Sequence, residues 1–92
     1  MSPLQFADIL EKCECPQIAD SYIDGDSCCA LGTMLKAYDS SAQALSDLPS
    51  EVIQELTDLD KELLMLGIDV MRLNHKKTFK EIAAIIQEEV NA

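Results

Sequence analysis

The sequence predicts an all-α fold: a compact bundle of four to five helices in a single domain, residues 1–92, that leaves room for a small two-stranded hairpin near residues 22–27. Two observations carry this prediction. Apolar residues recur at steps of three and four along most of the chain, and several S/T-x-x-E/Q capping boxes mark helix starts. A chain of 92 residues buries roughly 60–65% of its unfolded surface, which is enough for one core. With two Tyr, two Phe and no Trp, we expect that core to be aliphatic.

The first helix is predicted over residues 1–15. An S-x-x-Q capping box begins at Ser2, and Pro3 suits the first helical position. Pro16 disfavours the helical conformation at Cys15 and should end the helix there. One apolar face follows at i, i+3, i+4 and i+7, formed by Phe6, Ile9, Leu10 and Cys13.

A turn-rich segment and a second helix follow. The Asp24-Gly25 pair favours a type I′ hairpin turn between very short strands. Residues 28–38 are predicted to be helical with Ser27 as the cap, and Gly32 inside the helix indicates that another backbone packs close to it. The expected apolar face consists of Cys28, Leu31, Leu35 and Tyr38.

The middle of the chain carries the strongest periodic signal. A capping box at Ser40 predicts a short helix over residues 40–45. Residues 50–73 then predict one long helix, or two if a capping box at Thr57 restarts it, and Gly67 is a weak point. The seam of this helix consists of Val52, Leu56, Leu59, Leu63, Leu66, Val70 and Leu73, and Leu64, Met65, Ile68 and Met71 widen its apolar surface.

The last helix is predicted to pair with this long one as an αα-hairpin. Asn74 suits a left-handed helix end, and Thr78 with Glu81 forms a capping box that starts the next helix. The apolar stripe of the last helix is expected to fold back onto the seam, through Phe79, Ile82, Ala83, Ile86 and Val90.

The charge is strongly and unevenly negative. The net charge is −10, yet residues 72–80 alone carry +4. An acidic body repels nucleic acid and anionic membranes, so we expect neither as a direct partner. No basic region precedes an apolar leader segment, and no apolar run approaches the roughly 18 residues of a membrane span, so we expect a cytoplasmic protein with reduced thiols.

The one basic region is the candidate partner-binding site. We refer to its members as the basic cluster: Arg72, His75, Lys76, Lys77 and Lys80. Arg72 near a helix end complements the helix dipole, but Lys77 and Lys80 near the next helix start do not. That mismatch favours a contact with an anionic group or with the acidic body of the protein itself.

The four cysteines occur as Cys13-Glu14-Cys15 and Cys28-Cys29. Structural zinc sites usually show C-x₂₋₄-C pairs, and this spacing is a poor match. Cys13 and Cys28 also fall on predicted apolar helix faces, where a free cysteine behaves as a small hydrophobe. Structural thiols are therefore the favoured interpretation, with a metal site at Cys13, Cys15, Cys28 and Cys29 and redox chemistry as the alternatives.

Two segments carry a resemblance. Cys29–Ala37 reads C-A-L-G-T-M-L-K-A, and later the chain reads L-N at Leu73-Asn74 and T-F-K-E-I-A over Thr78–Ala83. These segments resemble a family of small uncharacterised bacterial and phage proteins that carry C-A-[LI]-G-A-L-x-x-A and [WL]-N-D…T-[FP]-x-E-[IV] stretches. The chain departs from that pattern at Thr33 and His75. The resemblance implies a compact, mostly helical fold and no assigned activity.

The sequence favours a non-enzymatic protein interaction or accessory module that binds a protein partner or itself. General acid–base catalysis needs an oriented partner for the single histidine, and none is apparent, so we predict no catalytic residues and no cofactor. The first alternative is a phage-type inhibitor whose acidic surface mimics nucleic acid and blocks a host defence or regulatory protein. The second is a cysteine metal-binding module.

Overall fold

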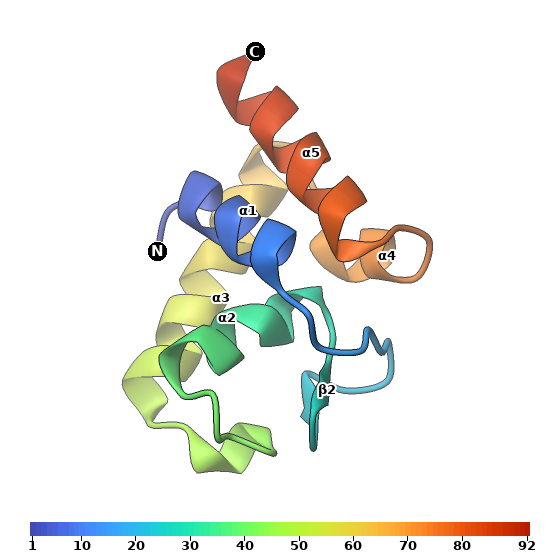
Figure 1. Cartoon of the computed structure of the whole chain (residues 1–92). Coiled ribbons are helices and arrows are strands. Elements are labelled where there is room, and N and C mark those ends of the chain that lie inside the picture. The colour runs from blue at the N-terminus through green and yellow to red at the C-terminus, as the bar shows by residue number, and fades with distance from the viewer.

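The computed structural model describes residues 1–92 and contains five α-helices, one 3₁₀ turn and a two-stranded sheet (Figure 1). In chain order the elements are α1 (Pro3–Lys12), β1 (Ile23–Asp24), β2 (Ser27–Cys28), α2 (Ala30–Tyr38), the 3₁₀ turn η1 (Leu45–Asp47), α3 (Ser50–Met65), α4 (Val70–Asn74) and α5 (Phe79–Asn91). The buried apolar residues form one cluster to which every helix contributes. The predicted helical fold with a small hairpin is confirmed in these terms.

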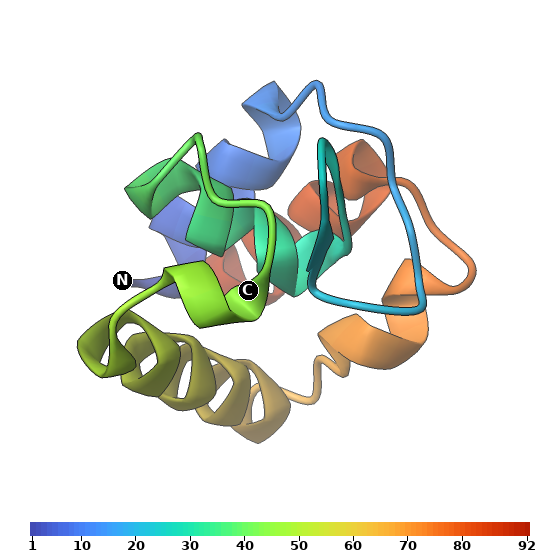
Figure 2. The ribbon, with the colours of Figure 1, turned by 90° about the horizontal axis from the view of Figure 1, so that it is seen from below.

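Helix α2 lies at the centre of the molecule. It packs against α1, α3, α4 and β2, and Figure 1 shows it between α1, α3 and the hairpin. Figure 2 shows the same arrangement from below. Its first six residues, Ala30–Leu35, are all buried, so the helix has no solvent-facing side over this stretch. The predicted apolar face was wrong at its end, because the side chain of Tyr38 is 46% exposed.

Gly32 lets the backbone before β1 touch α2. A Cβ atom at Gly32 would lie 1.8 Å from the carbonyl oxygen of Tyr22, so only glycine fits. The predicted close approach of another backbone is confirmed. The helix begins at Ala30 instead of Cys28, because Cys28 pairs with Ile23 in the sheet and is not available to the helix.

The hairpin exists, but its turn differs from the prediction. Asp24 pairs with Ser27, so the two turn residues are Gly25 and Asp26. Of these two turn residues, only Gly25 has a positive φ, of +61°. A positive φ at the first turn residue alone is typical of a type II′ turn, and the predicted type I′ turn would need it at both. Ser27 therefore lies in β2 and does not cap α2.

Helix α1 has the predicted start and an earlier end. The Ser2 capping box is present, and Pro3 occupies the first turn. The helix stops at Lys12, however, and Cys13 is already extended. The following segment runs beside β2, where the Cys28 N–H donates to the Pro16 carbonyl at 3.0 Å. The chain must leave the helix before Pro16 to reach that position.

The predicted long helix over residues 50–73 was wrong, because it is divided at Gly67. Gly67 has a φ of +82°. The Ile68 N–H donates to the Leu63 carbonyl at 2.9 Å, and the Gly67 N–H donates to the Leu64 carbonyl at 2.9 Å. This is a Schellman motif, which ends α3 and turns the chain into α4. The helix therefore breaks at Gly67, the predicted weak point. It does not restart at Thr57, because α3 continues through that residue.

The short helix predicted over residues 40–45 is also absent. The Asp39 carboxylate accepts hydrogen bonds from the N–H and hydroxyl of Ser41, at 3.0 and 2.6 Å, which closes a turn there. The Asp47 carboxylate accepts from the Gln43 and Ala44 N–H groups and fixes the 3₁₀ turn. Local side-chain bonds to the backbone therefore replace the expected helix.

Helix α5 has the predicted start and a different partner. The Thr78–Glu81 capping box is present. The apolar stripe of α5 packs chiefly against α1, and it meets the predicted seam only at α4, which carries Val70 and Leu73. The predicted return onto the seam is therefore confirmed at its α4 end and wrong along α3. Figure 1 shows α1 and α5 side by side. None of the five helices combines the length and apolar composition required to cross a bilayer.

Candidate metal centre

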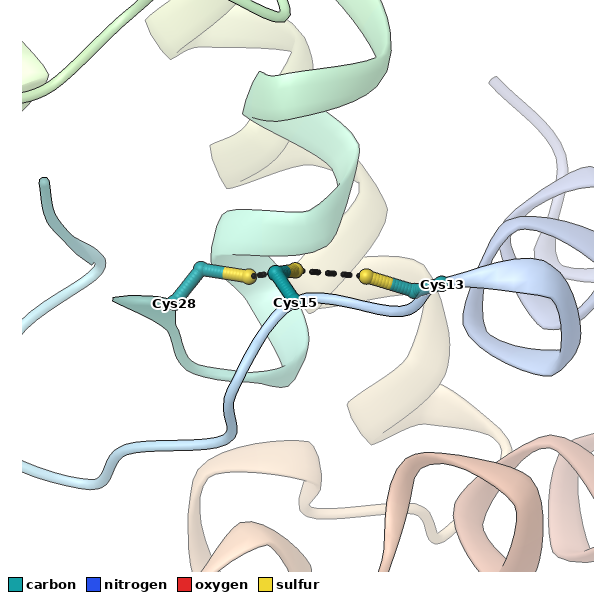
Figure 3. Close-up of side chains that lie close together, drawn as sticks. All are labelled: Cys13, Cys15 and Cys28. Atoms are coloured by element: carbon teal, nitrogen blue, oxygen red, sulfur yellow. Dashed lines mark hydrogen bonds between the residues drawn. The ribbon is translucent and has the colours of Figure 1, made fainter. Parts of the chain in front are cut away.

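Three cysteine side chains meet where the end of α1 faces the hairpin (Figure 3). Cys13 caps the C-terminus of α1, Cys15 lies in the loop that follows, and Cys28 ends β2. The Cys15 Sγ atom lies 2.6 Å from that of Cys13 and 2.7 Å from that of Cys28. All three sulfur atoms lie within 4.8 Å of one another. We call these residues the thiol cluster.

Backbone contacts hold the cluster together. The Ile18 N–H donates to the Cys28 carbonyl at 3.0 Å, and the Cys28 N–H donates to the Pro16 carbonyl. The loop carrying Cys15 is therefore attached to β2 as a short parallel bridge. The Cys29 N–H donates to the Tyr22 carbonyl at 3.1 Å and fixes the hairpin beside α2. These hydrogen bonds therefore fix the backbone positions of both cysteine-bearing segments relative to each other.

Cys29 belongs to the helix and not to the cluster. It is the N-cap of α2, and its Sγ atom accepts a hydrogen bond from the Gly32 N–H at 3.4 Å. Burial raises the pKa of Cys29, and hydrogen bonds from nearby backbone groups oppose that effect. Cys29 therefore has a structural role at the start of α2, in the place where Ser or Asp is common.

The cluster straddles the boundary of the core. Cys28 is fully buried, whereas Cys13 and Cys15 are half-buried. Burial, followed by the neighbouring Cys15 thiol, raises the pKa of Cys28, and the same causes raise the pKa of Cys13. Raised pKa values hold these two thiols in the neutral form, which suppresses their reactivity as nucleophiles. Cys13 and Cys28 therefore lack the lowered pKa of a catalytic cysteine.

The geometry suits a soft metal ion. Cysteine sulfur at a tetrahedral zinc lies about 2.3 Å from the ion, which places the sulfur atoms roughly 3.8 Å apart. The Cys13–Cys15 and Cys15–Cys28 sulfur pairs, now 2.6 and 2.7 Å apart, would need to separate by only about 1 Å to reach that spacing. The sulfur atoms of Cys13 and Cys28 already lie within 4.8 Å of each other. Thiolate ligands favour Zn²⁺, Cu⁺ and other thiophilic ions over hard cations.

The predicted set of four cysteines is thus divided by the structure. Cys13, Cys15 and Cys28 come together, and Cys29 points elsewhere. Cys13 and Cys28 do not lie on helix faces as predicted: one follows α1 and the other ends β2. One feature of the sequence does indicate the cluster. The two cysteine pairs lie on either side of a turn-rich segment, and such a segment can bring its two ends close together.

All members of the basic cluster are exposed. Arg72 lies on α4, Lys80 lies in the first turn of α5, and the others occupy the intervening loop. Neither ion pair in the structure involves them, since one joins Lys12 to Asp8 and the other joins the Met1 amino group to Glu55. His75, Lys76 and Lys77 border a shallow hollow of about 340 Å³ together with Gln17, Ile18, Ala19, Asn74 and Thr78.

The base of this hollow contains a buried polar contact that sequence reasoning missed. The Asn74 Oδ1 atom accepts from the Ala30 N–H and from the Gln17 side chain, both at 3.0 Å. Its Nδ2 atom donates to the Ile18 carbonyl at 2.8 Å. Gln17 Oε1 in turn accepts from the Phe79 N–H at 3.1 Å. We call Gln17 and Asn74 the amide joint.

The amide joint corrects the role predicted for Asn74. No residue other than glycine has a positive φ, so Asn74 is not in a left-handed conformation. It is the last residue of α4 and is only 8% exposed. Its side chain fixes α4 to the start of α2 and to the loop after Pro16. The position is therefore structural, and it borders the hollow without offering a free polar atom to it.

The chain matches no protein-family model, no curated protein and no solved structure. The resemblance to small bacterial and phage proteins through Cys29–Ala37 and Thr78–Ala83 therefore stays a prediction. Structurally, both segments begin with a helix cap, namely Cys29 for α2 and Thr78 for α5.

Proposed function

We propose that this protein is a small, non-enzymatic cytoplasmic module that binds one thiophilic metal ion through Cys13, Cys15 and Cys28. The observation that carries the proposal is the convergence of three sulfur atoms from two segments that are separated by a turn-rich loop. A reducing compartment would keep the thiols available to the ion. We assign a binding role because burial raises the pKa of Cys13 and of Cys28, which keeps both thiols in the neutral, weakly nucleophilic form.

An ion at this position would be linked to the fold. It would cross-link the end of α1 to β2 and thereby close the loop of residues 13–28. A ligand that binds only the folded chain stabilises it by about 4 kcal/mol when its free concentration is about 1,000 times the Kd. Metal binding should therefore raise the Tm of the protein.

The test is a titration of the reduced full-length chain with Zn²⁺, Cd²⁺ and Cu⁺ under anaerobic conditions. We expect one ion per chain in the wild type and in the Cys29→Ser variant, measured by equilibrium dialysis and elemental analysis. Cadmium–thiolate absorption in the ultraviolet reports the ligand type directly. Cys13→Ser and Cys28→Ser should each lower the affinity strongly.

Two results would overturn the proposal. One is a wild-type chain that binds none of the three ions while its thiols remain reduced. The other is a chain whose Cys15 forms a stable disulfide with Cys13 or Cys28 at cytosolic redox potentials, which would make the cluster a redox pair instead. Mass spectrometry after rapid alkylation distinguishes the free thiols from a disulfide.

A second candidate function is self-association, which a specific surface favours. Leu64, Met65 and Leu66 are 50%, 88% and 39% exposed at the end of α3. Leu66 also borders a hollow of about 460 Å³ whose other walls include Ile85 and Arg72. We call Leu64–Leu66 the apolar patch. A protruding side chain beside a hollow is complementary to a second copy in a two-fold interface.

Charge also favours a second copy as the occupant of this surface. Arg72 belongs to the +4 segment, whereas the rest of the chain is acidic, so the basic cluster of one copy complements the body of another. Size-exclusion chromatography with light scattering should show a dimer that Met65→Lys disrupts. A strict monomer at high protein concentration would remove this candidate.

A further inference from the structure

The thiol cluster offers three sulfur ligands and no fourth. The group of ligand atoms that lie within 4.8 Å of one another comprises Cys13, Cys15 and Cys28 alone, without a histidine, aspartate or glutamate. The nearest cysteine in sequence, Cys29, is engaged with the Gly32 N–H. Structural zinc sites are almost always four-coordinate. The donor set therefore fits an ion that is complete with three sulfur ligands.

The surroundings provide at most one cation that could balance a negative charge. Lys12 and Lys36 share a surface hollow with Cys13. Lys12 pairs with Asp8 at 3.1 Å, and Lys36 donates to the Gly25 carbonyl at 2.6 Å. The charge of Lys12 is therefore compensated by a carboxylate, whereas Lys36 keeps its charge and is held at the hairpin turn.

The net charge of the complex therefore decides which ion suits the site. Three thiolates leave −1 on a divalent ion and −2 on Cu⁺, but no charge on a trivalent centre. Cys28 is fully buried, and an uncompensated charge in such a place is costly. The whole chain is also acidic, with a net charge of −10, which opposes further negative charge.

We propose that the site takes trivalent arsenic, bound by Cys13, Cys15 and Cys28 in a neutral three-sulfur complex. This inference rests on the proposed function of the cluster as a metal site. Trivalent arsenic forms trigonal pyramids with thiolates, and its lone pair occupies the fourth direction. That direction can face the half-buried side of the cluster, where Cys13 and Cys15 reach the surface. Figure 3 shows the side chains of Cys13 and Cys15 on one segment meeting that of Cys28 on another.

The binding reaction is a condensation without a redox change. Arsenous acid reacts as As(OH)₃ + 3 RSH → As(SR)₃ + 3 H₂O. Three As–O bonds break and three As–S bonds form, and each thiol hydrogen leaves with a hydroxyl group as water. Arsenic stays trivalent, and the reaction needs neither an oxidant nor a reductant. It also changes no net charge at the site.

The test uses arsenite and Zn²⁺ as probes on the reduced full-length chain. Mass spectrometry should show one arsenic added and three hydrogens lost, and arsenic X-ray absorption should show three sulfur neighbours. In direct competition, arsenite should displace Zn²⁺ at comparable free concentrations. Loss of an outer-shell partner costs about 10–100-fold in metal affinity, and loss of a direct ligand should cost more than that. Cys13→Ser and Cys15→Ser should therefore weaken arsenite binding by more than about 100-fold.

The controls separate this inference from the proposed function. Cys29→Ser should bind arsenite as the wild type does, and the half-buried Cys13→Ser variant should fold even if Cys28→Ser does not. Arsenic bound by only two sulfur atoms, or lost equally in Cys29→Ser, would overturn the inference. If Zn²⁺ or Cu⁺ binds while arsenite does not, the inference fails and the proposed function stands. If no probe binds, both fail.

Discussion

The amide joint and the thiol cluster are built by the same loop, yet they differ in how their polar groups are paired. In the joint, Gln17 and Asn74 use their side-chain oxygen and nitrogen atoms in hydrogen bonds to other parts of the fold. In the cluster, Cys13, Cys15 and Cys28 contact mainly one another. The amide groups of the joint are thus paired within the chain, whereas the sulfur atoms of the cluster could still bind a ligand.

The difference lies in how far hydrogen bonding within the chain accounts for each contact. No buried side-chain nitrogen or oxygen in the structure is without a hydrogen-bond partner. Leaving such a group unpaired is expensive, so a fully paired amide is sufficiently explained by stability. Thiols form only weak hydrogen bonds, and three of them gain little from proximity alone. Their convergence is better explained by an additional ligand. Variants of the amide joint and of the thiol cluster test this comparison.

The largest loss of stability is expected from Gly32→Ala. This substitution would push the segment before β1 away from α2 and so disturb both the amide joint and the thiol cluster. The new Cβ atom would lie 1.8 Å from the Tyr22 carbonyl oxygen, and backbone atoms cannot move aside as a flexible side chain can. We expect a loss of more than about 3 kcal/mol of unfolding free energy, measured by urea denaturation.

Gly67→Ala is the matched control for that variant. Its φ of +82° strains any other residue, but nothing lies within 4 Å of the added methyl group. The control should lose only about 1–2 kcal/mol. If both variants lost the same amount, the close contact between Tyr22 and Gly32 would not be the cause.

Asn74→Ala should have the next largest effect and should act on the joint alone. It leaves the Ala30 N–H and the Ile18 carbonyl without their partner. We expect a loss of about 2–3 kcal/mol, because unpaired buried polar groups bear the full cost of desolvation. Zinc stoichiometry should remain one per chain in the folded variant. Asn91→Ala, at an exposed position, should change neither quantity.

Much of the fold follows from local signals in the sequence. The capping boxes at Ser2 and Thr78 fix the starts of α1 and α5, because their side-chain bonds involve only neighbouring residues. Gly32 also indicates a close backbone contact correctly. The pairing of α5 with α1 instead of α3 could not be predicted in this way, since an apolar stripe does not specify which helix covers it.

The site was less accessible to sequence reasoning, for a physical reason. Cysteine spacing predicts a metal site only when neighbouring residues bring the ligands together, as in a C-x₂-C pair. Here Cys15 and Cys28 meet because the hairpin turns at Gly25 and the loop after Pro16 bonds to β2. The role of Asn74 was hidden similarly, because three of its partners lie more than forty residues away in the chain.

Cys28→Ser should have a moderate effect without metal and a larger one with it. The serine hydroxyl would be buried with only the weakly hydrogen-bonding Cys15 thiol beside it, which costs about 1–3 kcal/mol. In excess Zn²⁺ the wild type should gain in Tm and this variant should not, so the difference between them should widen. Differential scanning calorimetry with and without Zn²⁺ measures both. Cys29→Ser should gain as the wild type does, because serine also caps helices well.

The smallest effect concerns the start of α5, beside the amide joint. Hydrogen bonds from the Thr78 backbone and side chain lower the pKa of Glu81 below its ordinary value of 4.5. A carboxyl group with a lowered pKa in the folded state stabilises the protein above its unfolded pKa, and that stability is lost as the pH falls through the folded value. Glu81→Gln keeps the capping bond but does not titrate. The wild type should therefore lose slightly more stability than this variant between pH 5 and about pH 3, measured by thermal unfolding. Equal pH profiles for the two chains would show that the capping box, unlike the joint next to it, contributes nothing through its charge.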